Sequence, residues 1–264
     1  MDAVIIAGGI PKPGELLYDE TQGSHKAMLD MCGKPMVQWV LDALEGCTSV
    51  HRVLISGLES ADALVSSKLV GVIDDQGGML QNMQAAARHY AQLPDSSAHL
   101  LVVSADIPGL RAEHVDWVVQ TAMQTDMDVY YTVIERRVME ARYPGSKRSY
   151  AKLRDLEVCG GDMNVLRKQT LLGNDEIWGR ILDARKNVFR QAALIGYGTL
   201  LLFMLRRLTL QQAVGRVAGR LHLSGQALVC PYAEVGMDVD KPFQLELMRS
   251  DLAGRPAALP VAAG

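Results

Sequence analysis

The sequence is poor in the residues that build disulfide scaffolds and zinc sites. Its 264 residues include only four cysteines, and no two of them form a Cys-x-x-Cys pair. This spacing argues against both a zinc site and a disulfide framework. We therefore expect buried free thiols in a reducing cytosol. The four cysteines are Cys32, Cys47, Cys159 and Cys230.

Long apolar segments and a strong net charge are also missing. The one candidate for a membrane segment is the run 198–205, far short of the roughly 20 residues that span a bilayer. We expect a buried or partner-facing helix there, with a membrane-surface helix as the alternative. The net charge of −3 gives no electrostatic reason for nucleic-acid binding. The short apolar start, with Asp2 in place of a basic segment, predicts no secretory leader and a cytoplasmic protein.

Two common nucleotide-binding signatures are absent as well. No segment matches the Walker pattern Gly-x-x-x-x-Gly-Lys-Ser/Thr, and none matches Gly-x-Gly-x-x-Gly. A P-loop is therefore not indicated, and a dinucleotide-binding site is disfavoured.

What the sequence does contain is an alternation of strand and helix patterns through its first half. Short apolar or β-branched runs predict strands at 3–7, 53–56, 70–73, 100–104 and 129–134. Apolar faces at helical spacing predict helices that span 36–46, 79–90 and 114–122. Such alternation implies an α/β protein of three layers, with a mostly parallel central sheet and helices on both faces.

The pattern changes after about residue 136. Basic and polar residues gather at 136–137 and 145–148, and residues from about 165 to 221 have a helical pattern broken by glycines. We expect a mainly helical insertion or lid, about 137–225, within a single domain of residues 1–252. A strand at 228–230 and a helix at 242–248 complete the domain. The Ala-, Pro- and Gly-rich residues 253–264 are predicted to form a disordered tail.

The first chemically informative segment is the glycine pair Gly8-Gly9, which follows the first predicted strand. Adjacent glycines let the chain turn sharply, and ligands of open α/β sheets bind just beyond the carboxyl ends of the strands. Lys26 and Lys34 follow, and lysines beside exposed amides are suited to phosphate. A tight strand-to-helix turn without a ligand is the alternative for the glycines alone.

Two acidic segments also lie where strands end. Asp106 follows an apolar strand and precedes Pro108, and a carboxylate there can bind Mg²⁺ together with substrate phosphates. Asp238 and Asp240 alternate just before the helix that Pro242 opens, so on an extended segment both project the same way. One of them can complete a metal site. Capping or turn formation is the alternative for each of the three carboxylates.

Taken together, these segments resemble a known family. The order Ala-Gly-Gly, Lys-Ala-Met-Leu, Gly-Lys-Pro-Met, Ser-Ala-Asp-Ile-Pro and Asp-Val-Asp-Lys-Pro resembles the nucleotidyltransferases of the glycosyltransferase-A-like fold. This broad group includes molybdenum-cofactor guanylyltransferases and sugar-phosphate nucleotidylyltransferases, and it implies a Rossmann-like, nucleotide-diphospho-sugar transferase-like architecture. The resemblance spans residues 1 to about 135 and about 226 to 250, and it does not cover the middle insertion.

The resemblance implies which residues hold the nucleotide. The backbone after the first strand wraps a nucleoside triphosphate, and Lys26 neutralises its phosphates as a catalytic residue. Residues 77–82 lie where such enzymes contact base or ribose, although a plain loop and helix start explains them equally well. The implied nucleotide-binding residues are Ala7, Gly8, Gly9, Lys26, Gly78 and Asn82.

The resemblance also implies a metal and an acceptor site. Asp106, the second catalytic residue, holds Mg²⁺ from one side and Asp240 from the other, with Asp238 as the alternate ligand. Gly161 and Asn164 belong to a Gly-Gly-x-x-Asn stretch that can face the acceptor in related enzymes. A basic group can meet an anionic acceptor or can simply be a solvated face; its members are Arg136, Arg137, Lys147, Arg148 and Arg154.

Two departures from the family pattern stand out. The family often has an arginine soon after the glycine pair, whereas here Lys12 is the only nearby cation and the loop to Lys26 is long. Lys241 stands where the family usually has threonine, and we expect it to be a solvated surface lysine.

These implications predict a Mg²⁺-dependent nucleotidyltransferase (EC 2.7.7.-). It would transfer a nucleoside monophosphate from a nucleoside triphosphate to a small anionic or polyol acceptor and release pyrophosphate. A glycosyltransferase of the same fold is one alternative, disfavoured because Ala-Asp-Ile replaces the usual Asp-x-Asp. A catalytically silent nucleotide-binding module is the other, disfavoured because Lys26 and the paired acids are retained. The insertion is predicted to be a lid or a homodimer contact.

Overall fold

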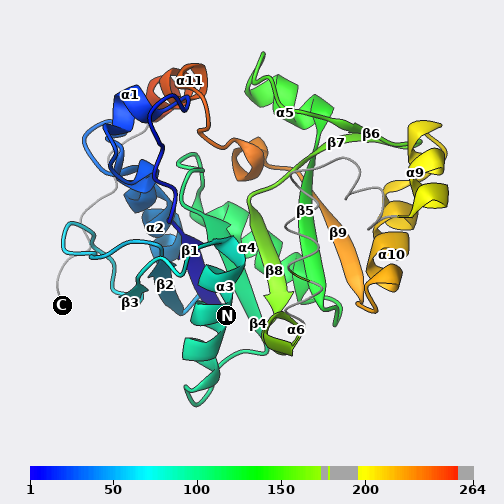
Figure 1. Ribbon diagram of the computed structural model, residues 1–264, viewed down its shortest axis with the longest axis horizontal. Coiled ribbons are helices and arrows are strands. Elements are labelled where there is room, and N and C mark those ends of the chain that lie inside the picture. The colour runs from blue at the N-terminus through cyan, green and yellow to red at the C-terminus, as the bar shows by residue number, and fades with distance from the viewer. Residues whose placement is uncertain (174–177, 179–195, 255–264) are drawn as a thin grey trace.

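The computed structural model describes residues 1–173, 178 and 196–254, and its central feature is a nine-stranded sheet (Figure 1). The strands are β1 (Asp2–Ile6), β2 (Arg52–Ser56), β3 (Leu69–Ile73), β4 (His99–Ser104), β5 (Val129–Glu135), β6 (Ala151–Lys152), β7 (Glu157–Gly160), β8 (Met163–Arg167) and β9 (Gly225–Cys230). Their order is β3-β2-β1-β4-β8-β5-β7-β6, and β9 pairs with β5. Only β7 and β8 run against the common direction of these nine strands.

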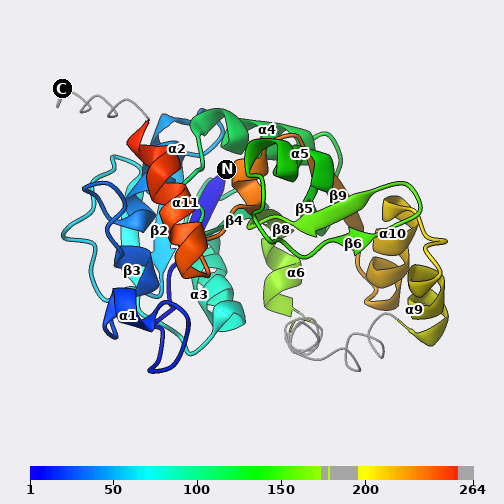
Figure 2. The same ribbon diagram turned by 90° about the horizontal axis from the view of Figure 1, so that it is seen from above.

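Helices cover both faces of this sheet, as Figure 2 shows from above. The α-helices are α1 (Tyr18–Thr21), α2 (Met36–Gly46), α3 (Met79–Ala91), α4 (Ala112–Ala122), α5 (Arg136–Arg142), α6 (Lys168–Gly173), α9 (Tyr197–Met204), α10 (Leu210–Arg220) and α11 (Pro242–Ala253). Two 3₁₀ turns, η1 (Lys26–Met28) and η2 (Ala233–Gly236), lie in the loops.

Both faces of the sheet are buried, because successive side chains along each strand point into two different hydrophobic cores. Ala3, Ile5 and Leu101 face the core that α2, α4 and α11 cover, whereas Val4 and Leu100 face the core that α3 and α6 cover. Burying one such aliphatic side chain contributes about 1.5–3 kcal/mol. The three-layer α/β fold with a mostly parallel sheet is therefore confirmed.

The prediction of a helical pattern from residue 165 is wrong at its start. Residues 163–167 form β8, which pairs antiparallel with both β4 and β5 in the middle of the sheet. A short apolar run does not distinguish strand from helix by periodicity, so only its distant pairing partners decide. Part of the segment predicted as an insertion thus belongs to the central sheet. Residues 174–177 and 179–195 of that segment, and 255–264 of the predicted tail, lie outside the described residues.

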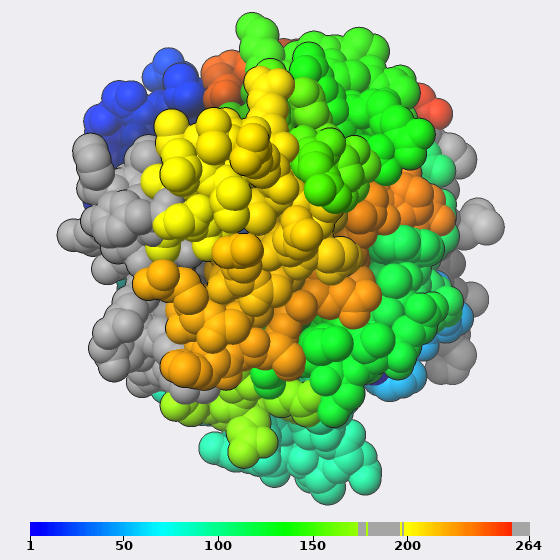
Figure 3. Space-filling model, turned by 90° about the vertical axis from the view of Figure 1, so that its right-hand side faces the viewer, coloured from blue at the N-terminus to red at the C-terminus, as the bar shows by residue number. Residues whose placement is uncertain are grey.

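The apolar run 198–205 is divided between packing and exposure. Phe203 of α9 packs against a small cluster with Leu153, Val158 and Leu210, whereas Leu201 and Met204 are 57% and 70% exposed. Figure 3 shows this end of the molecule, with α9 in yellow above the orange of α10. No helix among the described residues is both long and apolar enough to cross a membrane.

The predicted cysteine state is confirmed in part. All four thiols are free, and Cys47, Cys159 and Cys230 are buried, whereas Cys32 is exposed. The turn of Cys32 and Gly33 lies on the surface, so apolar packing does not cover this thiol.

A close backbone contact shapes the edge of the sheet that carries the carboxyl ends of the parallel strands. Gly57, directly after β2, has φ +105°, and a Cβ built on it would lie 2.2 Å from the Gly8 nitrogen. Only glycine allows both that φ angle and that approach. The turn after β1 therefore packs directly against Gly57 at the end of β2.

Candidate active site

The long loop after Gly9 returns to its own starting point. The Lys26 amide donates a hydrogen bond of 2.8 Å to the Gly9 carbonyl, so residues 17 positions apart become neighbours at the carboxyl end of β1. The amide groups of Gly8 and Gly9 have no hydrogen-bond partner among the described residues. They are available for phosphate oxygens. Ala7, by contrast, is buried and donates its amide to Ser56.

The Lys26 ammonium bridges two of the predicted carboxylates. Its Nζ lies 2.5 Å from Asp106 Oδ2 and 2.8 Å from Asp240 Oδ1. The lysine and Asp106 are mostly buried, whereas the Asp240 side chain is 55% exposed. Burial opposes the charge of Lys26, but Asp106 and Asp240 outweigh it and raise the lysine pKa above its ordinary value. The same lysine holds the pKa of Asp240 below its ordinary value, against the effect of burial.

The segment before α11 is tied to the end of β4. The Val239 amide donates to the Asp106 carbonyl at 2.9 Å, and Ser104 Oγ donates to Asp106 Oδ1 at 2.5 Å. The Asp240 amide donates to Gln244 of α11 at 3.0 Å. Asp106 and Asp240 are therefore positioned by contacts with the backbone, with Ser104 and with α11.

Asp238 belongs to a second ion-pair group. Arg148 donates to the Asp238 carboxylate, and its Nη2 lies 3.2 Å from the Gly160 carbonyl and 3.6 Å from Asp162 Oδ2. Burial raises the pKa of Asp238 to about 7; the charges of Asp106 and Asp240 add to the rise, and Arg148 opposes it.

Counted together, these side chains carry more negative than positive charge. Two cations, Lys26 and Arg148, face four carboxylates, those of Asp106, Asp162, Asp238 and Asp240. The excess of negative charge suits the binding of a cation at this position.

The donor set fits Mg²⁺ on chemical grounds. Asp106 and Asp240 supply hard carboxylate oxygens on either side of a point that already accepts the Lys26 ammonium. Mg²⁺ is typically held by one or two carboxylates plus substrate phosphates. The described residues contain no group of three or more His, Cys, Asp or Glu side chains arranged for a metal.

Asn82, a predicted nucleotide contact, serves the loop before α3. Its Nδ2 donates to Asp75 Oδ1 at 2.8 Å, and its Oδ1 accepts from the Gln76 amide at 2.7 Å. A Cβ added to Gly8 would lie 3.0 Å from that Asp75 oxygen. Asp75, which the sequence did not indicate, is therefore an exposed hydrogen-bond acceptor beside the glycine turn. Gly78 directly precedes α3 and has an extended backbone.

The predicted acceptor residues hold the sheet together. Asn164 Oδ1 accepts from the Thr132 amide at 2.9 Å, and the Gly161 amide donates to the Thr132 carbonyl at 2.8 Å. Their role toward an acceptor stays a prediction. Of the basic group, Arg136 pairs with Glu157 and Arg137 with Glu135, so both arginines serve surface ion pairs.

Two other lysines lie away from the Lys26 bridge. Lys34 pairs with Asp42 and stacks on the Trp39 ring at 3.7 Å, so its ammonium is held against α2. Lys12 is exposed on the loop.

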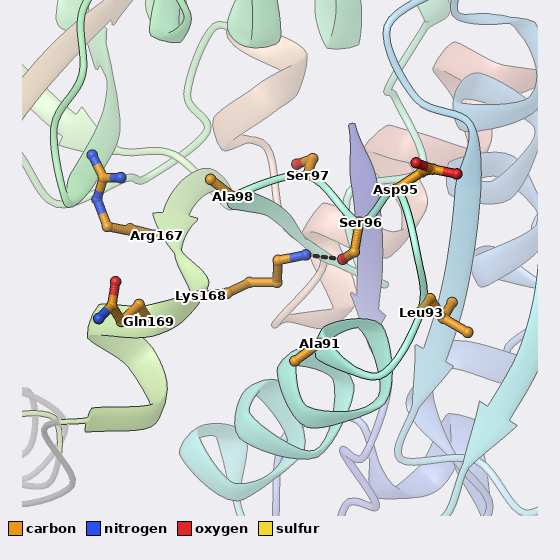
Figure 4. Close-up of a pocket in the computed structure, with 9 residues that line it drawn as sticks. All are labelled: Ala91, Leu93, Asp95, Ser96, Ser97, Ala98, Arg167, Lys168 and Gln169. Carbon is orange, nitrogen blue, oxygen red and sulfur yellow. Dashed lines mark hydrogen bonds between the residues drawn. The ribbon is translucent and has the colours of Figure 1, made fainter.

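A separate pocket of about 360 Å³ lies at the opposite edge of the sheet, where β4 begins and β8 ends (Figure 4). Its buried Lys168 donates to Ser96 Oγ and lies 3.4 Å from Asp2 Oδ2, which also pairs with Arg52. Lys168 and Arg52 thus share the carboxylate of Asp2, and none of the predicted site residues lines this pocket.

Comparison with known proteins identifies the family. The family model of the MobA-like NTP transferase domain matches residues 3–176, well over half of the chain. The chain belongs to the MobA-like NTP transferase family. Membership places it among the nucleotidyltransferases. No curated protein matches the sequence.

Solved structures agree with this assignment. A hypothetical transferase from Thermus thermophilus is 31% identical with a TM-score of 0.80, over 92% of this chain and 98% of that one. A 2-C-methyl-D-erythritol 4-phosphate cytidylyltransferase, also from Thermus thermophilus, is 14% identical with a TM-score of 0.54, over 96% and 100%. Molybdopterin-guanine dinucleotide biosynthesis protein A from Archaeoglobus fulgidus is 12% identical with a TM-score of 0.53, over 97% and 100%. The last two show the shared fold.

Proposed function

We propose that this member of the family is a Mg²⁺-dependent nucleotidyltransferase. It transfers a nucleoside monophosphate from a nucleoside triphosphate to a hydroxyl or phosphate of a small acceptor and releases pyrophosphate. The observation that carries the proposal is the Lys26 ammonium between Asp106 and Asp240, next to the Gly8–Gly9 turn. A phosphate-binding cation and two carboxylates suited to Mg²⁺ meet there.

The reaction needs positioning and charge balance more than covalent chemistry from the protein. The acceptor oxygen attacks the α-phosphorus and forms a new P–O bond. The bond to the β-phosphate breaks, and its electron pair leaves with pyrophosphate. Holding the two groups in line supplies much of the rate. Mg²⁺, when bound, neutralises phosphate charge and polarises the α-phosphoryl group.

Each residue of the site has a role in this reaction that follows from its position. The free amides of Gly8 and Gly9 receive phosphate oxygens, and Lys26 moves from Asp240 to the triphosphate as it arrives. Asp106 and Asp240 would hold the ion, and Ser104 orients Asp106 by a hydrogen bond to its carboxylate. Asp75 lies beside the same turn.

The test is a screen of the purified chain with four nucleoside triphosphates and Mg²⁺. The acceptors are phosphosugars, polyol phosphates, free polyols and pterin cofactors. Pyrophosphate is measured by a coupled assay, and the nucleotide adduct by mass spectrometry. We expect equal amounts of pyrophosphate and adduct with at least one pair of substrates, and loss of both with EDTA.

Other outcomes contradict the proposal in distinct ways. Release of a nucleoside diphosphate from a nucleotide sugar, without pyrophosphate, indicates the glycosyltransferase alternative. Tight nucleotide binding without any turnover across the panel indicates the silent module.

A further inference from the structure

The end of the molecule that α9 and α10 form has no part in the proposed reaction, and it presents apolar side chains to solvent (Figure 3). Leu201, Met204 and Leu205 are 57%, 70% and 55% exposed. They stand three and four positions apart, so they share one face of α9 and of the turn that ends it. These three side chains are the apolar patch of α9.

The segment that carries this patch has charge of one sign only. Residues 196–233 contain four arginines and no aspartate or glutamate. The whole chain has a net charge of −3, so the rest of it carries −7. All four arginines are exposed; they are Arg206, Arg207, Arg216 and Arg220.

The four arginines lie close to the apolar patch. Arg206 and Arg207 follow it directly in the chain. Arg216 and Arg220 stand four positions apart on the exposed face of α10, and α10 packs against α9. The Arg220 guanidinium also lies against Gly196, the residue before α9. Apolar and cationic side chains therefore belong to one surface.

None of these four arginines forms an ion pair with a residue that the structure describes. Two acids of the neighbouring β6–β7 segment have other partners. Asp155 accepts from the Leu210 amide at 3.2 Å, and Glu157 pairs with Arg136 at 2.9 Å. Arg206 attracts Glu157 only from beyond ion-pair distance. The charges of the four arginines are thus available to an anionic partner.

We propose that α9, the arginine pair after it and the exposed face of α10 bind the surface of a bilayer that contains anionic lipids. Acidic headgroups attract the arginines, and the apolar patch enters the layer just beneath those headgroups. One partner thus satisfies both features of this surface. The contact is peripheral, because α9 has eight residues and about 20 are needed to span a bilayer.

Other partners match only part of this surface. A nucleic acid matches the arginines, but it leaves the apolar patch without an apolar contact. A second copy of the chain matches the patch, but a symmetric contact brings the arginines of both copies together. Self-association in water is therefore weak, and a lipid surface competes with it.

The test is flotation of the full chain with lipid vesicles, without nucleotide or metal. One set of vesicles is pure phosphatidylcholine, and the other contains equal amounts of phosphatidylcholine and phosphatidylglycerol. We expect binding to the anionic vesicles to be stronger by about tenfold or more, since each arginine near such a surface adds to the attraction. Salt at about 1 M, which shortens the Debye length to about 3 Å, should remove most of this preference.

Two charge variants separate a local effect from net charge. Arg206→Gln with Arg207→Gln should weaken binding to anionic vesicles by about thirtyfold, the factor that about 2 kcal/mol supplies at about 1 kcal/mol for each arginine. The matched control is Arg88→Gln with Arg111→Gln, which removes two exposed charges of α3 and of the residue before α4. This control should bind as the unaltered chain does.

A third variant tests the apolar patch at constant charge. Leu201→Ser with Met204→Ser should weaken binding to anionic vesicles by about tenfold or more, because less apolar surface enters the lipid. Val65→Ser is its control, since Val65 is also exposed but precedes β3, away from α9. Circular dichroism checks that each variant is folded. If Arg206→Gln with Arg207→Gln does not fold, Arg216→Gln with Arg220→Gln takes its place and should likewise weaken binding.

Several outcomes overturn the proposal. One is equal or absent binding to the two kinds of vesicle, and another is a charge variant that binds as its control does. A stable dimer that does not bind vesicles gives the surface to a second copy, and retention on duplex DNA in place of vesicles gives it to a nucleic acid. No turnover is measured, so these results are independent of whether the chain releases pyrophosphate.

Discussion

At the scale of single residues, the decisive group is the Lys26 ammonium. It is shared between two carboxylates, and the backbone amide of the same residue donates to the Gly9 carbonyl after β1. The Lys26 charge therefore holds the two carboxylates together. We propose that it also binds the phosphates when the nucleotide enters the site. A lysine used in this way affects both ground-state binding and the transition state.

Lys26→Ala should raise KM for the nucleoside triphosphate and lower kcat, each by about tenfold or more, since about 1.4 kcal/mol of lost stabilisation suffices for a factor of ten. Steady-state kinetics at saturating acceptor separate the two constants. Lys34→Ala is the matched control, because Lys34 pairs with Asp42 on α2. If Lys26→Ala and Lys34→Ala have the same kinetics, Lys26 does not bind the phosphates, and Lys12 becomes the candidate for that role.

Asp106→Asn should lower kcat by about a hundredfold or more while the protein stays folded, by analogy with the loss of one preorganised electrostatic group. The side chain is isosteric and Lys26 keeps Asp240 as a partner, so circular dichroism should show a folded protein. Asp116→Asn is the control: its carboxylate accepts from Ser49 at 2.6 Å, away from the site, so activity should persist. Full activity of a folded Asp106→Asn protein removes Asp106 from the mechanism.

The lowered pKa of Asp128 predicts how the stability of the fold depends on pH. Burial opposes its charge, but hydrogen bonds from Ser224 and Thr170 together with Arg167 lower its pKa to about 2. A carboxylate with a folded pKa below its unfolded value stabilises the fold above about pH 4, and this contribution disappears as the pH falls toward 2. Asp128→Asn should therefore lower the free energy of unfolding by about 2 kcal/mol at pH 7 and by almost nothing near pH 2.

Chemical denaturation at both pH values measures this difference. Asp126→Asn is the control, since that side chain is 80% exposed and its pair with Arg167 contributes little. An equal loss of stability at pH 7 and pH 2 would show that the charge of Asp128 is not what stabilises the fold.

The sequence predicted the site residues through the order of their motifs, and it could not predict their partners. Lys26, Asp106 and Asp240 follow from the family pattern, and the structure places them in contact, while their catalytic roles stay predictions. The pairing of Arg148 with Asp238 joins residues 90 positions apart. No local pattern reports such a contact, so Arg148 was predicted only as one of several basic residues that can meet an acceptor.

At the scale of elements, α9 shows how one apolar run serves two purposes. Phe203 packs inward on the cluster with Leu153 and Leu210, whereas Leu201 lies on the opposite, exposed side. Apolar side chains on a free face are suited to contact with another surface. The run alone could not predict this division, because every residue from 200 to 205 is apolar.

Phe203→Ser should lower the free energy of unfolding by about 2 kcal/mol, because it leaves a partly filled gap in the small core. Leu201→Ser should leave stability within about 0.5 kcal/mol and weaken self-association. Calorimetry measures the first effect, and light scattering over a concentration series the second. A larger loss of stability from Leu201→Ser than from Phe203→Ser would contradict the packing described for α9.

The strands divide into those that sequence could predict and those that it could not. β1, β2, β3, β4 and β5 lie within one residue of their predicted positions at nearly every end, since each is a short apolar or β-branched run between loops. β8 was missed because its place is set by β4 and β5, which lie far from it in sequence. Tertiary pairing overrides local pattern in such a strand.

At the scale of the whole molecule, the sheet joins two unlike halves. Strands β3, β2, β1 and β4 form a parallel half, and β5 with β7, β8 and β9 forms a mixed half. The candidate site lies where they meet: Lys26 and Asp106 come from the first half, and Asp240 follows β9. Ligands of open α/β sheets bind beyond the carboxyl ends of the strands, where the strand order changes.

The position of β8 has a consequence for how the protein is made. When β4 leaves the ribosome, its partner β8 lies some sixty residues later in the chain, so one edge of β4 is exposed in the meantime. Unpaired edges of growing chains are prone to wrong pairing, and chaperones protect them. The Lys26–Asp240 contact joins residues 214 positions apart, so it too forms only after the segment before α11 has been made. A nascent chain that ends before this segment therefore lacks one of the two carboxylates that Lys26 bridges.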